Sequence, residues 1–474
     1  MQKLTVINVV GLAQNLIGQH TPNIKEFMEK GALATVEAAV PAVTTTAQST
    51  YLTGVTPSEH GIVGNGWMFR DEMEIKFWRQ SNKLVQHRNL WEHAREVAAE
   101  RGEAFTVANM FWWYAMNSTA DYVATPRPMY PADGLKLPDV YTWPMELRDE
   151  LQADLGQFPL FEFWGPNSSI RSTEWIANAS KRMVEKHDPT LTLVYLPHLD
   201  YNLQRFGPDV DAVATDLQEV DRVVGDLLTF MAQHDREVVI VSEYGISHVD
   251  TPVHLNRLFR KKGWISYRME VGREMIDPGM CRAVAVADHQ IAHIYVNDPS
   301  IMDEVRELVA STPGVAELLD RDGQRAYGMD HDRAGEFVAL AEPNAWFTYY
   351  FWLDDSKAPD YARTVDIHRK PGYDPVELFF NPELTNPKFH AATKVLKKKL
   401  GFRYLMDVIG LDATLVKGSH GVRTAPEDGP LIITQRPDAL NATHIDATDV
   451  YGVLAAHLGI TEREENAVPI PAGD

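Results

Sequence analysis

Short runs of apolar, β-branched residues alternate along this chain with longer segments of amphipathic character. Residues 4–10, 191–196 and 237–241 are apolar on both faces, as strands inside a parallel sheet are. Residues 173–187 and 212–234 have the apolar spacing of helices that pack on such a sheet. The alternation predicts a doubly wound α/β/α sandwich, in which the active site lies at the carboxyl ends of the strands.

Two regions interrupt this rhythm. Residues 66–166 are crowded with tryptophan, phenylalanine and tyrosine, and we expect an inserted or cap region there. Such residues more often fill a core or a subunit contact, but over a site they would shape an apolar pocket. Residues 264–415 are expected to form a second insertion or a smaller α+β subdomain. Strands at 291–296 and 336–341 would flank a helix at 301–310.

Composition limits the possible partners. The chain has 474 residues, expected to form one core domain (1–474) that carries both insertions. Its 45 basic and 66 acidic residues give a formal charge of −21, which disfavours a nucleic-acid polymer but leaves a small phosphate ester possible. The single cysteine, Cys281, excludes an intramolecular disulfide and a cysteine-based zinc site. We find no membrane-spanning run and no leader, and expect a cytoplasmic protein without a membrane partner. The oligomeric state is not specified.

The most informative motif begins at residue 41 and ends at Asn65. An apolar lead-in is followed by three threonines beginning with Thr44, then by a helical run, and a glycine-rich turn delivers Asn65. This order places a hydroxyl nucleophile at the tip of a strand with an amide donor nearby. Two simpler interpretations exist, because a threonine here often caps a helix and an asparagine often occupies a turn.

The motif resembles the nucleophile segment of the type I phosphodiesterase/nucleotide pyrophosphatase branch of the alkaline phosphatase superfamily. Four further segments, between about residues 4 and 460, resemble that family in the same order. They are Val10-Gly11, Asp200 to Pro208, Ser242-Glu243-Tyr244-Gly245 and Gly418-Ser419-His420-Gly421. The resemblance implies an α/β/α sandwich of the alkaline phosphatase type. It also implies a phosphodiesterase-like hydrolase with Thr44 as nucleophile and Asn65 as donor to the phosphoryl oxygens.

The resemblance further implies two metal positions, and the position that activates the nucleophile is the poorer one. Glu243 and Thr44 would be its ligands, whereas Val10 stands where the family has aspartate and Tyr244 where it has histidine. Asn8 shares the strand parity of Val10 but lies roughly 6–7 Å back along the strand and cannot replace an aspartate there.

The second implied position, for the leaving group, keeps more of its ligands. Asp200 and His420 are present, with Gln204 in place of a histidine, and His198 could supply a replacement ligand. Three protein ligands are the usual minimum for catalytic zinc. We therefore expect a divalent metal, preferably zinc, with one ion rather than two, or none. Gln204 and Tyr244 could instead act as hydrogen-bond donors.

Two functions remain open at this stage. One is a hydrolase of a small phosphate ester or nucleotide that uses Thr44 with a reduced metal site. The other is a catalytically degenerate protein that binds a ligand or partner on the same fold. The retained motif residues favour the first, and the missing ligands favour the second. His289 and His293 would lie on one face of a strand, about 13 Å apart, and are expected to serve packing or the surface.

Overall fold

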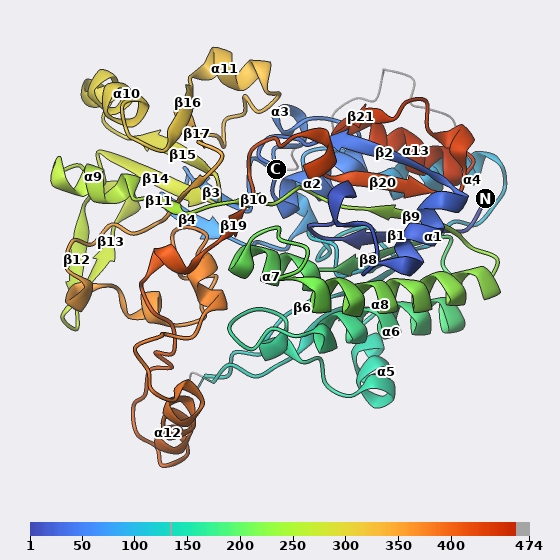
Figure 1. The fold of residues 1–474 in the computed structure, drawn as a ribbon, viewed down its shortest axis with the longest axis horizontal. Coiled ribbons are helices and arrows are strands. Elements are labelled where there is room, and N and C mark those ends of the chain that lie inside the picture. Colours follow the sequence, from blue (N-terminus) through green and yellow to red (C-terminus); the bar gives the residue numbers. More distant parts are fainter. Residues whose placement is uncertain (133–134, 461–474) are drawn as a thin grey trace.

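The computed structural model describes residues 1–132 and 135–460, in which an α/β body lies beside a smaller lobe (Figure 1). Within these residues the body is built on a nine-stranded sheet of order β21-β2-β20-β9-β1-β8-β5-β6-β7. Its strands are β1 (Leu4–Val9), β2 (Ala32–Glu37), β5 (Val107–Met110), β6 (Tyr122–Pro126), β7 (Val140–Trp143), β8 (Leu191–Leu196), β9 (Glu237–Val241), β20 (Leu431–Thr434) and β21 (His444–Asp446). The five strands from β9 to β6 run parallel to one another.

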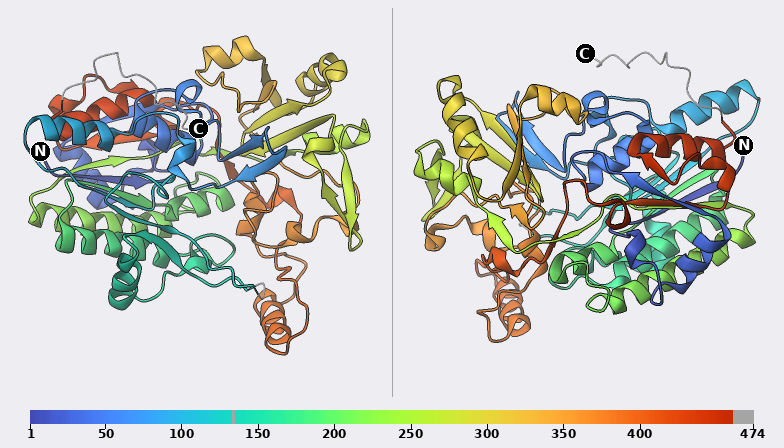
Figure 2. Two further views of the ribbon diagram at one scale, coloured as in Figure 1. Left: turned by 180° about the vertical axis from the view of Figure 1, so that it is seen from behind. Right: turned by 45° about the horizontal axis from the view of Figure 1, so that its top comes forward.

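Helices cover both faces of this sheet (Figures 1 and 2). One layer contains α1 (Pro22–Lys30), α5 (Glu146–Leu155), α6 (Ile170–His187) and α8 (Ala214–Gln233). The other contains α2 (Thr44–Thr53), α4 (Leu90–Glu100) and α13 (Val450–His457). Every residue of β1 and β8 is buried, as the apolar pattern of a strand covered on both faces requires. The predicted α/β/α sandwich is confirmed.

The predicted elements differ from the observed ones mainly at their ends. Residues 191–196 and 237–241 form strands with the predicted bounds. The helix predicted from residue 173 already begins at Ile170, because Ser169 accepts a hydrogen bond from the amide of Arg171 and caps it. Such a cap lies outside the apolar pattern, so periodicity alone could not reveal it.

The smaller lobe has its own sheet and its own core. Its strands are β14 (Ala283–Asp288), β15 (Ile291–Val296), β17 (Phe337–Ala341) and β16 (Val315–Leu319), paired antiparallel in that order. Three helices accompany them: α9 (Leu255–Lys261), α10 (Met302–Ala310) and α11 (Arg321–Ala326). Met68 and Phe77, from the hairpin of β3 (Gly66–Phe69) and β4 (Glu74–Phe77), are part of this core. The domain limits proposed from the sequence remain predictions.

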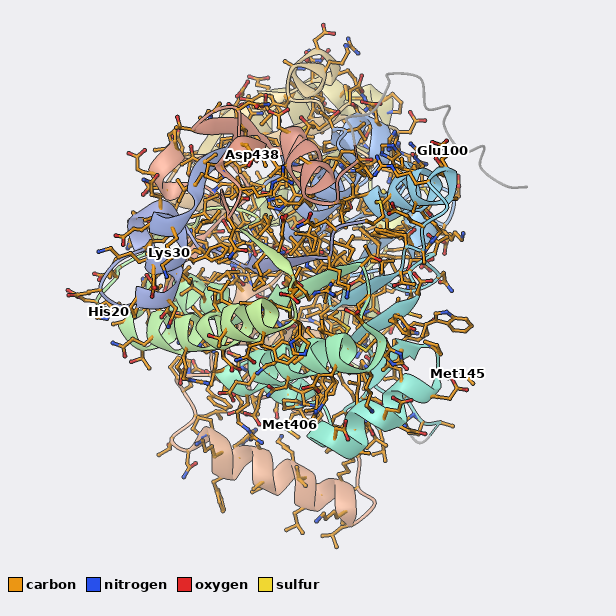
Figure 3. The ribbon with its side chains drawn as sticks, turned by 90° about the vertical axis from the view of Figure 1, so that its right-hand side faces the viewer. His20, Lys30, Glu100, Met145, Met406 and Asp438 are labelled. Carbon is orange, nitrogen blue, oxygen red and sulfur yellow. The ribbon has the colours of Figure 1, made fainter. Side chains whose placement is uncertain are left out.

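The aromatic-rich residues 66–166 take part in both units. The β3–β4 hairpin joins the core of the smaller lobe, whereas β5, β6 and β7 complete one side of the main sheet. One further helix, α12 (Pro387–Lys399), projects from the molecule (Figures 1 and 3), with Ala391 packed against the core of the smaller lobe. None of its residues is buried.

Candidate functional site

Three neighbouring strands bring the candidate residues together. In the parallel sheet β1 lies between β8 and β9, and Asn8 is level with Tyr195 on one side and Val241 on the other. The chain that leaves β8 enters α7 (His198–Phe206), which carries Asp200, and the chain that leaves β9 continues to Glu243. Both carboxyl groups therefore lie at the carboxyl edge of the sheet, as predicted for this fold.

A cavity of about 680 Å³ opens over this edge. Five of the predicted site residues line it: Thr44, Asp200, Gln204, Tyr244 and His420. Its walls are largely aromatic and include Trp78, Trp113, Trp164, Tyr195, Tyr201 and Tyr373. All three of these tryptophans come from the aromatic-rich residues 66–166. An apolar, largely preformed cavity with a few polar groups on its floor is the usual form of a small-molecule site.

Thr44 is the first residue of α2 and lies on the cavity floor. The residue in the capping position is Val43, and no side chain caps the helix, so the simpler interpretation of Thr44 as an N-cap is wrong. Its Oγ1 is 3.4 Å from the hydroxyl of Tyr244, which donates to Asp200 Oδ1 at 3.3 Å. Tyr244 thus stands between the candidate nucleophile and a buried carboxyl group.

Glu243 is fully buried beneath Thr44 and is held by two amides. Its Oε1 accepts hydrogen bonds from Asn8 Nδ2 at 2.6 Å and from Gln48 Nε2 at 2.5 Å. Burial raises the pKa of Glu243 to about 8, and hydrogen bonds from Gln48, Asn8 and Thr44 lower it in part. The sequence did not identify Gln48, although it lies one helical turn after Thr44, a spacing that places both on one side of α2.

Asp200 and Gln204 form a second hydrogen-bonded pair on the floor. Gln204 Nε2 donates to Asp200 Oδ2 at 2.8 Å, and its Oε1 accepts from the hydroxyl of Tyr373 at 2.9 Å. Burial raises the pKa of Asp200 to about 7, while hydrogen bonds from Gln204 and Tyr244 lower it in part. Burial also raises the pKa of the Tyr244 hydroxyl well above its usual range, so Tyr244 stays a donor.

His420 lies between two rings. It stacks on Tyr244 with centroids 3.5 Å apart and packs against His289 at 3.6 Å. Its Nδ1 is 2.8 Å from the carbonyl oxygen of Ala42, which assigns the proton to Nδ1. Nε2 is buried and has no hydrogen-bond partner among the described residues. Burial lowers the pKa of His420 to about 3, so the ring is neutral and Nε2 is available as an acceptor or ligand.

His289 is a site residue that the sequence interpretation missed. It lines the cavity and stacks on Tyr373 at 3.6 Å. It does not belong to a strand, because its φ of 63° places it in the turn before β15. His289 is buried between the rings of Tyr373 and His420, so it packs as expected, but the expected position on a strand was wrong. His293 also packs as expected, because that side chain is buried against the backbone of Val63 and Gly335.

Asn65 lies behind Thr44, and the described lining of the cavity does not include it. Its backbone amide and Nδ2 donate to the two oxygens of Asp288 at 2.7 and 3.1 Å, and its Oδ1 accepts from the amide of Thr45 at 3.1 Å. Asn65 thus anchors the start of α2 to the smaller lobe. Its role as a donor to phosphoryl oxygens remains a prediction.

His198 points away from the cavity and belongs to a different cluster. Its Nε2 is 3.1 Å from Asp216 Oδ1 and 3.1 Å from Glu219 Oε2, both on α8. Among the described residues, these three form the one group of histidine, cysteine, aspartate or glutamate side chains whose ligand atoms lie within 4.8 Å of one another. A possible metal-binding group therefore exists outside the cavity. His198 does not replace a ligand on the cavity floor.

The floor does not fit a cation that activates Thr44. Val10 is fully buried and apolar, and Tyr244 offers a protonated hydroxyl. Glu243 faces the amide donors of Asn8 and Gln48 rather than further anionic ligands, which favours a proton acceptor over a metal ligand there. The leaving-group position has a better donor set, because His420 Nε2 is unpartnered and Asp200 and Gln204 supply oxygens. These donors suit one ion at most.

Comparison with known proteins identifies relatives by sequence. The family model for type I phosphodiesterase/nucleotide pyrophosphatase matches residues 4–374. An uncharacterized pyrophosphatase/phosphodiesterase of Schizosaccharomyces pombe is 26% identical over 262 residues, which are 53% of this chain and 46% of that protein. The chain therefore spans about half the length of this curated relative.

Solved structures with the same fold include enzymes of two descriptions. Murine ectonucleotide pyrophosphatase/phosphodiesterase 5, an inactive form in complex with AMP, has a TM-score of 0.59 at 15% identity, covering 99% of this chain and 98% of that one. Phosphonoacetate hydrolase from Sinorhizobium meliloti 1021 in complex with phosphonoformate has a TM-score of 0.59 at 14% identity, covering 96% of each chain. At these identities the likeness shows the fold alone.

Proposed function

Because the chain belongs to the type I phosphodiesterase/nucleotide pyrophosphatase family, we propose that it hydrolyses a small phosphate ester or nucleotide, with Thr44 as nucleophile. One observation carries this proposal. The Thr44 hydroxyl lies on the floor of an aromatic cavity, within 3.4 Å of a tyrosine hydroxyl that also contacts Asp200. A threonine that served only to begin the helix would not need such neighbours.

We assign the activation of Thr44 to Glu243. The carboxylate form of Glu243 accepts the Thr44 proton as the bond from Oγ1 to phosphorus forms and the bond to the leaving oxygen breaks. A pKa raised to about 8 by burial suits a base that works near neutral pH. Asn8 and Gln48 orient the carboxylate, since both donate to the same oxygen. Water then hydrolyses the phosphothreonine.

The other floor residues bind and orient the ester. Tyr244 stays protonated, and its single O–H turns from Asp200 to a phosphoryl or leaving oxygen when the ester binds, while its contact with Thr44 fixes the direction of attack. The aromatic walls exclude water and accommodate the apolar part of the leaving group.

We propose that one divalent ion, preferably zinc, binds to Asp200, Gln204 and His420. Such an ion supplies a Lewis acid for the leaving oxygen. The unpartnered, buried Nε2 of His420 supports this assignment. Metal analysis of protein purified without chelators, compared with His420→Ala, tests it. Equal metal content in both would exclude this site.

Turnover of aryl phosphodiesters across a panel of divalent metals tests the function. Thr44→Ala should abolish turnover and leave the melting temperature nearly unchanged, since the contact of the Thr44 hydroxyl with Tyr244 is a long one of 3.4 Å. Thr46→Ala is the matched control, because the Thr46 hydroxyl bonds the carbonyl of Ile62 and is not among the described cavity residues. It should retain activity while losing about 1 kcal/mol of stability. Activity that survives Thr44→Ala would place the chemistry elsewhere.

A second function has one observation in its favour. Val10 and Tyr244 occupy both positions where the family resemblance implies further ligands for the activating metal, as a protein that binds a ligand without turnover would allow. Ligand binding detected by calorimetry, together with no turnover under any metal condition, would support this function and exclude the hydrolase.

A further inference from the structure

Helix α12 exposes an unusual amount of apolar surface. Phe389 and Leu396 of the helix, and Leu400 and Phe402 directly after it, are between 57% and 69% exposed. Figure 3 shows the helix apart from the α/β body, with Met406 on the side that faces the body. Isolated exposed apolar residues are common, but several on one projecting helix mark an interaction surface.

Phe389 and Leu396 of α12, with Leu400 at its C-cap, form one stripe, whereas Val395 lies on another side of the helix. At about 100° per residue, Leu396 and Leu400 lie within about 20° of Phe389 around the helix axis. Lys397 lies about 80° to one side of Phe389, and Lys399 about 80° to the other. An apolar stripe flanked by lysines is the pattern of a helix that lies in the interface between a bilayer and water.

The charge of this segment opposes that of the rest of the protein. Residues 387–404 contain five lysines and Arg403 and no acidic residue, whereas the whole chain carries −21. Lys388, Lys397, Lys399 and Arg403 are exposed, and none has an ion-pair partner among the described residues. These four cations are therefore available to an external anionic partner.

The opposite side of the same helix lines the cavity. Ala391, Val395 and Lys398 belong to the cavity wall. Tyr130 and Phe161, which are 58% and 53% exposed, line the cavity from other segments. The apolar stripe therefore lies next to the rim of the candidate site and not on a remote surface.

We propose that α12 binds the surface of an anionic lipid bilayer and turns the cavity rim toward it. The apolar stripe enters the headgroup region, and the four unpaired cations contact anionic headgroups. A second copy of this chain is a poorer partner, since a two-fold contact would bring both sets of cations together. Within the described residues no helix is long and apolar enough to cross a membrane. The expectation of no membrane partner rested on spanning segments and does not address this peripheral contact.

Vesicle flotation tests the proposal independently of catalysis. The full chain should bind vesicles of phosphatidylcholine mixed with phosphatidylglycerol at low salt, and bind phosphatidylcholine alone weakly. Each Lys or Arg near an anionic surface contributes about five-fold to partitioning. A charge variant with Lys388→Gln, Lys397→Gln, Lys399→Gln and Arg403→Gln should therefore partition on the order of several hundred-fold less.

A matched control removes four exposed cations elsewhere that also have no ion-pair partner among the described residues: Lys83→Gln, Lys261→Gln, Lys262→Gln and Lys357→Gln. It should bind as the unchanged protein does. A stripe variant (Phe389→Ser, Leu396→Ser, Leu400→Ser) should lose binding and keep its melting temperature, because α12 has no buried residue. Equal binding by the charge variant and its control would overturn the proposal. So would light scattering that shows a dimer abolished by the stripe variant without vesicle binding.

Discussion

Replacing Glu243 with glutamine changes the charge of the site with little change in shape. Asn8 and Gln48 donate to Oε1, which glutamine retains as an acceptor. The variant should therefore fold, and its stability should respond less to pH. Turnover should also be lost, because the amide cannot accept the Thr44 proton.

The direction in which the unfolding free energy changes with pH follows from the direction of the pKa change. Burial raises the pKa of Glu243 from 4.5 to about 8, so the folded state holds a proton that the unfolded chain releases. The stabilisation is complete below the unfolded value and is lost as the pH rises through about 8. Between pH 6 and pH 9 the loss amounts to about 3 kcal/mol of unfolding free energy, at 1.36 kcal/mol for each unit of differential protonation. Asp200 and Asp288, each with a pKa raised to about 7 by burial, add to the decline in the unchanged protein.

Urea unfolding followed by tryptophan fluorescence measures this effect. The unfolding free energy should fall more steeply from pH 6 to pH 9 in the unchanged protein than in Glu243→Gln, by about 3 kcal/mol. Glu100→Gln, at an exposed glutamate on the surface of α4 (Figure 3), serves as the control and should leave the slope unchanged. Parallel pH profiles for the unchanged protein and Glu243→Gln would refute the reasoning, since Glu243 would then be ionised in the folded state.

Two further predictions concern a buried ion pair and the choice of substrate. Lys370 Nζ lies 2.8 Å from Asp374 Oδ2 and 2.6 Å from Glu377 Oε1, with all three side chains at most 2% exposed. Lys370→Met should lower the unfolding free energy in urea by about 3–5 kcal/mol, because two buried carboxyl groups lose their cation; an unchanged midpoint would contradict this. The cations that line the described cavity, Lys136 and Lys398, are partly exposed, and the floor carries carboxyl groups. Singly charged diesters should therefore have a higher kcat/KM than doubly charged monoesters with the same leaving group, and the reverse order would indicate an undetected cationic subsite.

The fold could be predicted because its information is local. Strands such as 191–196 and 237–241 are short apolar runs between helices, and buried parallel strands require that pattern. The rule that links such sheets to sites at their carboxyl ends then placed Asp200 and Glu243 together. Confirmation of the sheet therefore also confirmed which edge carries the candidate residues.

The rest of the site depends on contacts between distant segments. Asp288 and His289 come from the smaller lobe, and their approach to Asn65 and His420 depends on how that lobe packs against the body. A turn with positive φ at His289 is a property of one backbone conformation, not of an apolar period. The expectation of no membrane partner considered only segments that cross a bilayer. It did not consider a helix that lies on the bilayer surface.

Val10 and Tyr244 stand where the family resemblance implies an aspartate and a histidine. These two differences are consistent with each other when the charge near Glu243 is considered. Without an aspartate at position 10, a cation near Glu243 would lack anionic ligands, and a lone buried carboxylate would be costly. The structure resolves this conflict with neutral partners: amide donors meet Glu243, and the Tyr244 hydroxyl contacts both Thr44 and Asp200. Glu243 Oε1 has two amide donors, whereas Glu243 Oε2 is buried without a hydrogen-bond partner among the described residues. This arrangement supports the proposal that Glu243 accepts the Thr44 proton without a metal ion beside it.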